Sequence, residues 1–312
     1  MTQRLKMEMS SGAHLGTKGD ICFVNGKLVS VAEDNMLKVY NIQNSKLDKV
    51  QEIEISGGET FTLCSNQVDK LILAGNDKVV NTFNINAETG LTADNFKEPF
   101  TALKFDSEVK KVKLNGSKWI LGVSEDEHVS IFNTETKATL HCKPGHAGCM
   151  AKSAQIDQSN SFVATTGSDG YLNIYKLSSD QDSLEFLSKV KICEKKVPAE
   201  RGFDLEPQWL NEDTILIPGS KSLGFLSKDE DNEKVWEICH EEQVQHDHEI
   251  TSVFSLSNEV LISYSQEDST LKVWLMNEEG AKCQYEFKYD NTLIAIQYDN
   301  QTKTLACMDN EC

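Results

Sequence analysis

A short motif recurs along the chain with constant internal spacing, and this repetition constrains the fold more than any other feature of the sequence. An aspartate is followed by an apolar residue three positions later and by an aromatic residue three positions after that. The aromatic residues of the first four copies lie 43, 49 and 43 residues apart. Such a period indicates a protein built from repeated structural units. The five copies are Asp34-Leu37-Tyr40, Asp77-Val80-Phe83, Asp126-Val129-Phe132, Asp169-Leu172-Tyr175 and Asp268-Leu271-Trp274.

The long interval before the last copy has room for one degenerate repeat. Tyr175 and Trp274 are 99 residues apart, about twice the period. Between them the segment SKSLGFLS places two leucines in register but has Ser220 where the aspartate should be. A further period begins with TLIAIQY and reaches Asp309 near the end of the sequence. We therefore expect seven repeated units.

Each unit combines several short strands. Alternating apolar residues precede the turns in KLVSVAED, WILGVSED and VLISYSQED, and another apolar strand lies upstream in DICFV and ITSVFSL. Alternation with a period of two predicts strands, and helical periodicity is almost absent. Four short strands per 43 to 50 residues are typical of a blade in a β-propeller.

The repeated aspartates are interpreted as structural residues. An aspartate in a tight turn accepts hydrogen bonds from nearby groups, and the aromatic residue packs against the next blade. Catalytic carboxylates would have to converge in one pocket, whereas these are distributed around a ring. We assign no residue to catalysis, and the framework residues are Asp34, Asp77, Asp126, Asp169, Asp268 and Trp274.

The end of each repeat resembles that of the WD40 repeat, with Trp274 at the tryptophan position of the motif. WD40 propellers commonly carry Gly-His before the innermost strand, and Gly145-His146 stands in this place, with His14 and His248 in similar places. Most blades lack the Gly-His pair, so the chain resembles a divergent member. The resemblance implies a buried polar network in the fourth blade, formed by His146, Thr165, Asp169 and Tyr175.

The expected fold is an all-β, seven-bladed WD40-type β-propeller that forms a single domain over residues 1–312. Propellers close by pairing strands from the two ends of the chain, and residues 3–9 alternate in the manner of such a strand. We expect this segment to pair with the blade built from residues 292–308. The last blade would then lack a strand, which suggests the N-terminal part of a longer protein.

A narrower resemblance rests on the order of these segments. The fourth repeat TGSDGYLNIYKL, followed by TILIPGSKSLGFLS with Pro218, resembles the N-terminal propeller of the acidic nucleoplasmic DNA-binding proteins. These replisome adaptors are related to the yeast chromosome-transmission-fidelity factor. The resemblance implies a nuclear protein that links helicase and polymerase at replication forks. None of that family's binding residues can be carried over to this sequence.

The charge of the chain disfavours autonomous binding of DNA. Its 31 Lys and Arg residues and 49 Asp and Glu residues give a net charge of −18, which repels a polyanion. The most basic segment extends from Lys189 to Arg201 and has no aromatic residues for base stacking. We interpret this segment as a lysine-protected sheet edge.

Two clusters of histidine and cysteine suggest metal binding at first sight. One contains His141, Cys142, His146 and Cys149, and the other contains Cys239, His240, His246 and His248. Neither has the ligand spacing of a recognised zinc site. No nucleotide-binding, hydrolase or metalloprotease motif is present either. We expect no metal and no cofactor, although an enzyme whose residues meet at a channel mouth stays an alternative.

The expected function is a protein-interaction scaffold for proteins or peptides. The acidic segment 227–243 is a solvated strand and loop or a docking site for a basic peptide, with Trp236 as its aromatic anchor. The N-terminus has no apolar signal region and no stretch is long enough to span a membrane. Nine scattered cysteines suit a reducing compartment. The resemblance to the replisome adaptors implies a nuclear protein, with a cytoplasmic scaffold as the alternative.

Overall fold

The computed structural model describes residues 18–309 except 44–45, 56–58, 68, 76, 86–90, 92–95, 97–98, 100, 126–128, 147, 179–181, 194–204, 233, 242–244, 258, 278–279 and 300–302. Within the described residues, every element of regular secondary structure longer than a single turn is a β-strand. No helix in this part of the chain has the length and apolar character needed to cross a bilayer.

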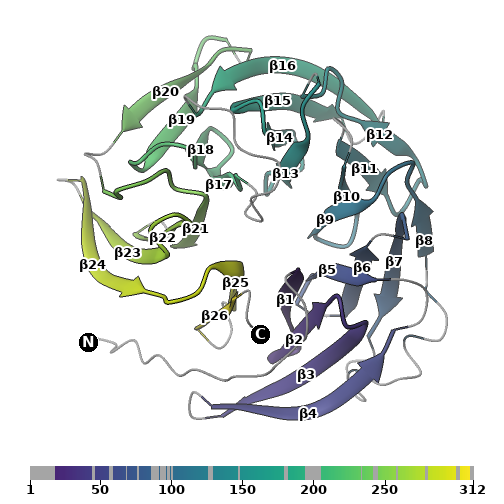
Figure 1. Ribbon diagram of the computed structural model, residues 1–312. Coiled ribbons are helices and arrows are strands. Elements are labelled where there is room, and N and C mark those ends of the chain that lie inside the picture. The colour runs from purple at the N-terminus through teal and green to yellow at the C-terminus, as the bar shows by residue number, and fades with distance from the viewer. Residues whose placement is uncertain are drawn as a thin grey trace. The chain divides into compact units, whose positions relative to one another are not determined.

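Six sheets, called blades 1 to 6 in chain order, each contain four consecutive strands (Figure 1). Blade 1 contains β1 (Gly19–Val24), β2 (Lys27–Ala32), β3 (Met36–Gln43) and β4 (Lys46–Glu54). Blade 2 contains β5 (Thr60–Ser65), β6 (Lys70–Gly75), β7 (Val79–Asn84) and β8 (Thr101–Lys104). Blade 3 contains β9 (Val109–Asn115), β10 (Trp119–Ser124), β11 (Val129–Asn133) and β12 (Thr139–His141).

The remaining blades follow the same order. Blade 4 contains β13 (Ala151–Ile156), β14 (Phe162–Gly167), β15 (Tyr171–Ser178) and β16 (Ser183–Lys191). Blade 5 contains β17 (Gln208–Asn211), β18 (Thr214–Ile217), β19 (Gly224–Lys228) and β20 (Trp236–Glu241). Blade 6 contains β21 (Ser252–Ser257), β22 (Val260–Ser265), β23 (Thr270–Asn277) and β24 (Gly280–Lys288). A two-stranded sheet of β25 (Leu293–Asp299) and β26 (Thr304–Asp309) comes last.

The all-β prediction is confirmed, but the prediction of seven blades is wrong. The described residues form six four-stranded blades, and the seventh period forms only the pair β25–β26. The seventh repeat was recognised only from its two inner strands and its turn, and these features are the same in a two-stranded and a four-stranded sheet. The predicted closing strand at residues 3–9 lies outside the described residues. The single domain over residues 1–312 stays a prediction.

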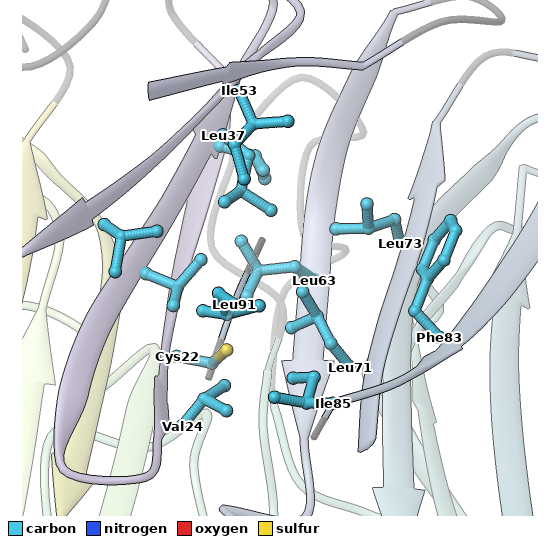
Figure 2. Packing of buried hydrophobic residues seen from close by; sticks show 13 residues of the cluster. Cys22, Val24, Leu37, Ile53, Leu63, Leu71, Leu73, Phe83, Ile85 and Leu91 are labelled. Carbon is cyan, nitrogen blue, oxygen red and sulfur yellow. The ribbon is translucent and has the colours of Figure 1, made fainter. Parts of the chain in front are cut away.

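The contacts group the chain into two compact units, which are described separately. The first contains residues Met1–Val112 and Leu293–Cys312, and the second contains Lys113–Thr292. In the first unit, leucines of blade 2 pack against the apolar face of blade 1 (Figure 2). Leu37 of β3 and Leu63, Leu71 and Leu73 of blade 2 belong to this cluster and are almost fully buried.

Strand β1 is buried on both of its faces. Cys22 and Val24 belong to the cluster shared with blade 2. Ile21 and Phe23 instead pack with Met308 of the two-stranded sheet. Successive side chains of a strand point to opposite faces, so a strand between two sheets needs a continuous apolar run. This requirement explains the segment ICFV at residues 21–24.

The second unit repeats this arrangement between its consecutive blades. Val163 of β14 packs in the cluster between blades 3 and 4, whereas Phe162 and Ala164 pack in the cluster between blades 4 and 5. A third cluster joins blades 5 and 6 and includes Trp274. Pro218 directly follows β18, which ends at Ile217, so the proline removes no hydrogen-bond donor from that strand.

We expect Leu37→Ala to lower the free energy of unfolding by about 2 to 5 kcal/mol, because it leaves a cavity in the blade 1–blade 2 cluster. Leu47→Ala is the matched control, since Leu47 is 39% exposed on β4. Urea unfolding of the two variants measures the difference. Equal losses would contradict the packing described here.

Candidate functional site

The predicted network of blade 4 joins the loop before β13 to strand β14 and the turn that follows it. His146 is buried, and its Nδ1 lies 2.9 Å from Asp169 Oδ1 while its Nε2 lies 3.0 Å from Thr165 Oγ1. A carboxylate only accepts hydrogen bonds, so the imidazole donates from Nδ1 and accepts the threonine hydroxyl at Nε2. Tyr175 is also buried, and its hydroxyl donates to the carbonyl oxygen of Pro144.

Electrostatics keep this network in one protonation state at neutral pH. Burial lowers the pKa of His146, against the opposing attraction of Asp169, so the imidazole is neutral. Burial alone would raise the pKa of Asp169, but His146 and Lys189 outweigh it and hold that pKa below its ordinary value. Lys189 Nζ lies 3.0 Å from Asp169 Oδ2. The aspartate is therefore ionised and fixed by a histidine and a lysine.

Gly167 leaves the space that His146 occupies. A β-carbon at residue 167 would lie 2.3 Å from His146 Cγ, which is far too close for any side chain. The glycine of the TGSDG turn is thus required by close packing of the imidazole on β14.

Blade 6 contains a second network, which was not predicted from the sequence. Trp274 Nε1 donates to Ser263 Oγ at 2.8 Å, and Ser263 Oγ lies 2.7 Å from His246 Nε2. The imidazole Nδ1 lies 3.5 Å from Asp268 Oδ2. From its position in the sequence His248 was expected here, but His248 is about half exposed, whereas His246 is buried. His14 lies outside the described residues.

The spacing of residues contained a signal for His246. In blade 4 the histidine precedes the aspartate by 23 residues. His248 precedes Asp268 by only 20 residues, so His246 is nearer to the blade 4 spacing. The segment HDH places His246 and His248 only two residues apart, so sequence position alone distinguished the two histidines only weakly.

Ser263, His246 and Asp268 match the residue types of a nucleophile–base–acid triad, but their surroundings oppose catalysis. The Ser263 side chain is fully buried and accepts the indole N–H of Trp274. A nucleophile must reach a substrate, and this hydroxyl lies inside the blade. The blade 6 network therefore fixes the structure of the blade.

The turn aspartates of the other blades make a common local bond. Asp34 Oδ1 accepts the amide of Met36 at 3.1 Å, and Asp77 Oδ1 accepts the amide of Val79 at 3.1 Å. In blade 5, Ser220 Oγ accepts the amide of Ser222 at 3.2 Å, so the degenerate repeat keeps the turn bond. Asp126 lies outside the described residues.

Trp236 is a core residue, which corrects its interpretation as the aromatic anchor of a docking site for a basic peptide. Its side chain is 3% exposed and packs edge-on against Trp209 and Phe162, with ring centroids 5.7 and 5.9 Å apart. The acidic segment 227–243 misled the prediction because Trp236 begins β20. Its side chain lies in the cluster between blades 4 and 5, whereas Glu237 and Ile238, which follow it, are exposed.

The two histidine–cysteine clusters are dispersed. In the first cluster, His141 Nδ1 lies 3.0 Å from Ser130 Oγ, and Cys142 is buried in the apolar cluster between blades 3 and 4. In the second, Cys239 Sγ donates to the carbonyl oxygen of Phe225 at 3.3 Å. Within the described residues, no group of three or more potential ligands is arranged to hold a metal ion.

The basic segment is only partly described. Lys189 contacts Asp169 and lies over the ring of Tyr171, with 4.3 Å between Nζ and the ring centroid. Lys195, Lys196 and Arg201 lie outside the described residues.

A pocket of about 200 Å³ lies in the second unit at blades 3, 4 and 5. We call it the glutamine pocket, because Gln155 of β13, Gln158 after β13 and Gln208 of β17 line it. Its other lining residues are Lys113, Leu114, Asn115, Leu121, Ile156 and Trp209. The inner strands of three consecutive blades therefore contribute polar groups to one space.

Hydrogen bonds hold the wall of the glutamine pocket in place. Asn115 Nδ2 donates to the carbonyl oxygen of Asp157 at 3.1 Å and to Asn160 Oδ1 at 2.9 Å, which ties the end of β9 to the turn after β13. Asp157 is buried and accepts the amides of Ser161 and Phe162. The indole of Trp209 donates to the Gln155 carbonyl oxygen at 3.4 Å.

The charged groups beside the pocket neutralise each other. Lys113 Nζ forms an ion pair with Glu206 Oε1, and the side chains are 20% and 8% exposed. By contrast, the side-chain amides of Gln155, Gln158 and Gln208 form no hydrogen bond within the described residues. The pocket thus has free hydrogen-bonding capacity but no unpaired charge among its described lining residues.

Comparisons with known proteins identify the fold. No protein-family profile matches the sequence, and no curated protein matches it significantly. The WD40 β-propeller domain of Doa1 superposes with a TM-score of 0.72, at 11% identity over 96% of this chain and 92% of that domain. The β-propeller domain of Cps50 (Swd1) from Myceliophteria thermophila gives a TM-score of 0.69, at 12% identity over 95% of each chain. The chain therefore has the WD40 β-propeller fold.

We expect Asp169→Ala to lower the free energy of unfolding by roughly 1 to 3 kcal/mol, because it removes the acceptor of the buried His146 Nδ1. Asp77→Ala is the matched control, since Asp77 accepts a backbone amide in its turn and has no histidine partner in the described residues. Urea unfolding measures both changes. A loss in Asp77→Ala as large as that in Asp169→Ala would refute the importance of the blade 4 network.

We expect stability to decrease as the pH falls from about 7 to about 4. Burial, helped by Lys272 and opposed by Asp268, lowers the pKa of His246 to about 4. An unfolded histidine has a pKa near 6.5, so between these values the unfolded state binds the proton more readily. The contribution of His246 to the free energy of unfolding is complete at pH values above the pKa of an unfolded histidine. It is lost progressively as the pH falls towards the pKa of His246 in the folded protein.

Urea unfolding at a series of pH values checks this expectation. His246→Gln is expected to reduce the slope of stability against pH, and the half-exposed His248 provides the control His248→Gln. The lowered pKa of His146 acts in the same direction and leaves a residual slope. Identical slopes for the wild type and His246→Gln would show that His246 does not titrate as described.

Proposed function

We propose that this protein is an interaction scaffold that binds partner proteins and is not an enzyme. The observation that carries the proposal is the glutamine pocket, whose three glutamines offer open hydrogen-bonding groups on a rigid wall. Its one ionisable lining residue, Lys113, is paired with Glu206. Acid–base and nucleophilic catalysis need an accessible reactive group, whereas binding needs only positioned polar and apolar contacts.

The WD40 β-propeller fold supports a scaffold through its construction. Rigid blades place many loops and strand ends on one framework, and loops on a rigid scaffold are common binding sites. The two polar networks described above lie inside blades, so they maintain this framework and leave the surface for partners. The net charge of −18 favours partners with basic surfaces by long-range attraction.

The cellular setting that we propose is the nucleus, at sites of DNA replication. The proposal rests on the resemblance of the segments from TGSDGYLNIYKL to TILIPGSKSLGFLS to the replisome adaptors described above. In such a setting the protein would connect replication proteins to one another. A scaffold of a cytoplasmic complex is the competing assignment.

Imaging and proximity labelling of the tagged full chain in its own cells test this function. We expect a nuclear signal that coincides with newly synthesised DNA during S phase, together with labelling of helicase and polymerase subunits. A cytoplasmic signal with a different set of labelled proteins would refute the replication setting. An enzymatic turnover detected with the purified chain would refute the scaffold itself.

The purified chain is expected to bind duplex DNA only weakly and with strong salt dependence, because its net negative charge repels phosphates. Fluorescence anisotropy with a labelled duplex at physiological salt measures this affinity. Submicromolar binding would contradict the prediction and would direct attention to the segment from Lys189 to Arg201.

A further inference from the structure

The size of the glutamine pocket limits what can bind there. Pockets for cofactors and drug-sized molecules have volumes of roughly 300 to 1,000 Å³. The glutamine pocket has a volume of about 200 Å³, which is several times the volume of roughly 30 Å³ that one water molecule takes up in liquid water. It is too small for a cofactor and large enough for one inserted side chain with part of its main chain.

The charge balance of the pocket disfavours an ionic ligand. A carboxylate would have to compete with Glu206 for Lys113, and a cation would have to compete with Lys113 for Glu206. The pair already satisfies the charge of Lys113, so the pocket offers no net charge that would attract an ionic ligand. The occupant should therefore be uncharged.

The open groups of the pocket define the chemistry of the occupant. Each glutamine amide carries two N–H donors and one carbonyl acceptor. A ligand that only accepts would leave the carbonyl oxygens unpaired on burial, and one that only donates would leave the N–H groups unpaired, whereas another amide pairs with both kinds of group. Leu114 and Ile156 line the same space and suit the methylene groups of such a side chain.

From these limits we infer that the glutamine pocket binds an extended segment of a partner protein by inserting one asparagine or glutamine side chain between Gln155 and Gln208. This inference deepens the scaffold function proposed above and rests on it. The ligand is recognised by amide pairing and not by charge. The wall held by Asn115 and Asp157 is already ordered, which reduces the entropic cost of binding.

A displayed library of random twelve-residue peptides, selected on the full chain, tests the inference. The double variant Gln155→Met/Gln208→Met removes both amides but keeps unbranched side chains of similar length. Gln284→Met is the matched control, because Gln284 is exposed on β24 and does not line the pocket. Thermal unfolding of the variants, compared with the wild type, shows whether each remains folded.

We expect the selected peptides to share an asparagine or glutamine at one position. Replacing that residue with leucine should weaken binding at least about tenfold, the effect of losing one good buried hydrogen-bonded group. The double variant should lose affinity to the same extent and should not distinguish the two peptides, whereas Gln284→Met should bind as the wild type does. Peptides that prefer a charged residue, bind the folded double variant unchanged or fail to enrich would overturn the inference.

The experiments distinguish a failure of the glutamine pocket as a peptide site from a failure of the scaffold function. If partner proteins found by proximity labelling bind the double variant with unchanged affinity, the scaffold stands and the glutamine pocket is not its peptide site. If peptides bind through the glutamines but no partner protein is labelled in cells, the pocket chemistry stands and the scaffold function fails.

Discussion

The structure depends on strands that are buried on both faces. Strands β2, β10 and β14 consist almost entirely of buried residues, so each needs an apolar sheet on either side. One blade cannot satisfy this requirement alone, and stability comes from the contacts between consecutive blades. The apolar clusters of both units accordingly lie between blades rather than within one.

The buried polar networks and the glutamine pocket differ in whether their hydrogen bonds are already formed. In blades 4 and 6, the buried His146 and His246 are bonded to a hydroxyl inside the blade and lie beside an aspartate. Such networks specify one arrangement because leaving a member unpaired is costly. The glutamine pocket is the opposite case, since the side-chain amides of its three glutamines have no hydrogen-bond partner within the described residues. The glutamine amides can therefore form hydrogen bonds with a ligand, whereas the buried networks have no such groups to offer at the surface.

Local patterns in the sequence were sufficient for the class of fold and for the turns. Alternating apolar residues predicted the strands, and the spacing from aspartate to aromatic residue predicted the repeat. Asp34 and Asp77 accept amides two residues ahead, a contact that depends only on the local chain. The blade 4 grouping of His146, Thr165 and Asp169 came from the WD40 resemblance, and the structure brings these residues together.

The sequence by itself thus determined strands, turns and the repeat, because these depend on contacts between residues close in the chain. Only the tertiary structure decided that six blades are complete, that Trp236 is buried, and that three glutamines meet in one pocket. The period does not reveal whether outer strands pair, and a tryptophan in an acidic segment has the same local signal whether it faces solvent or core. Gln155 and Gln208 lie on strands of different blades, so their proximity follows from blade packing, which no local pattern encodes.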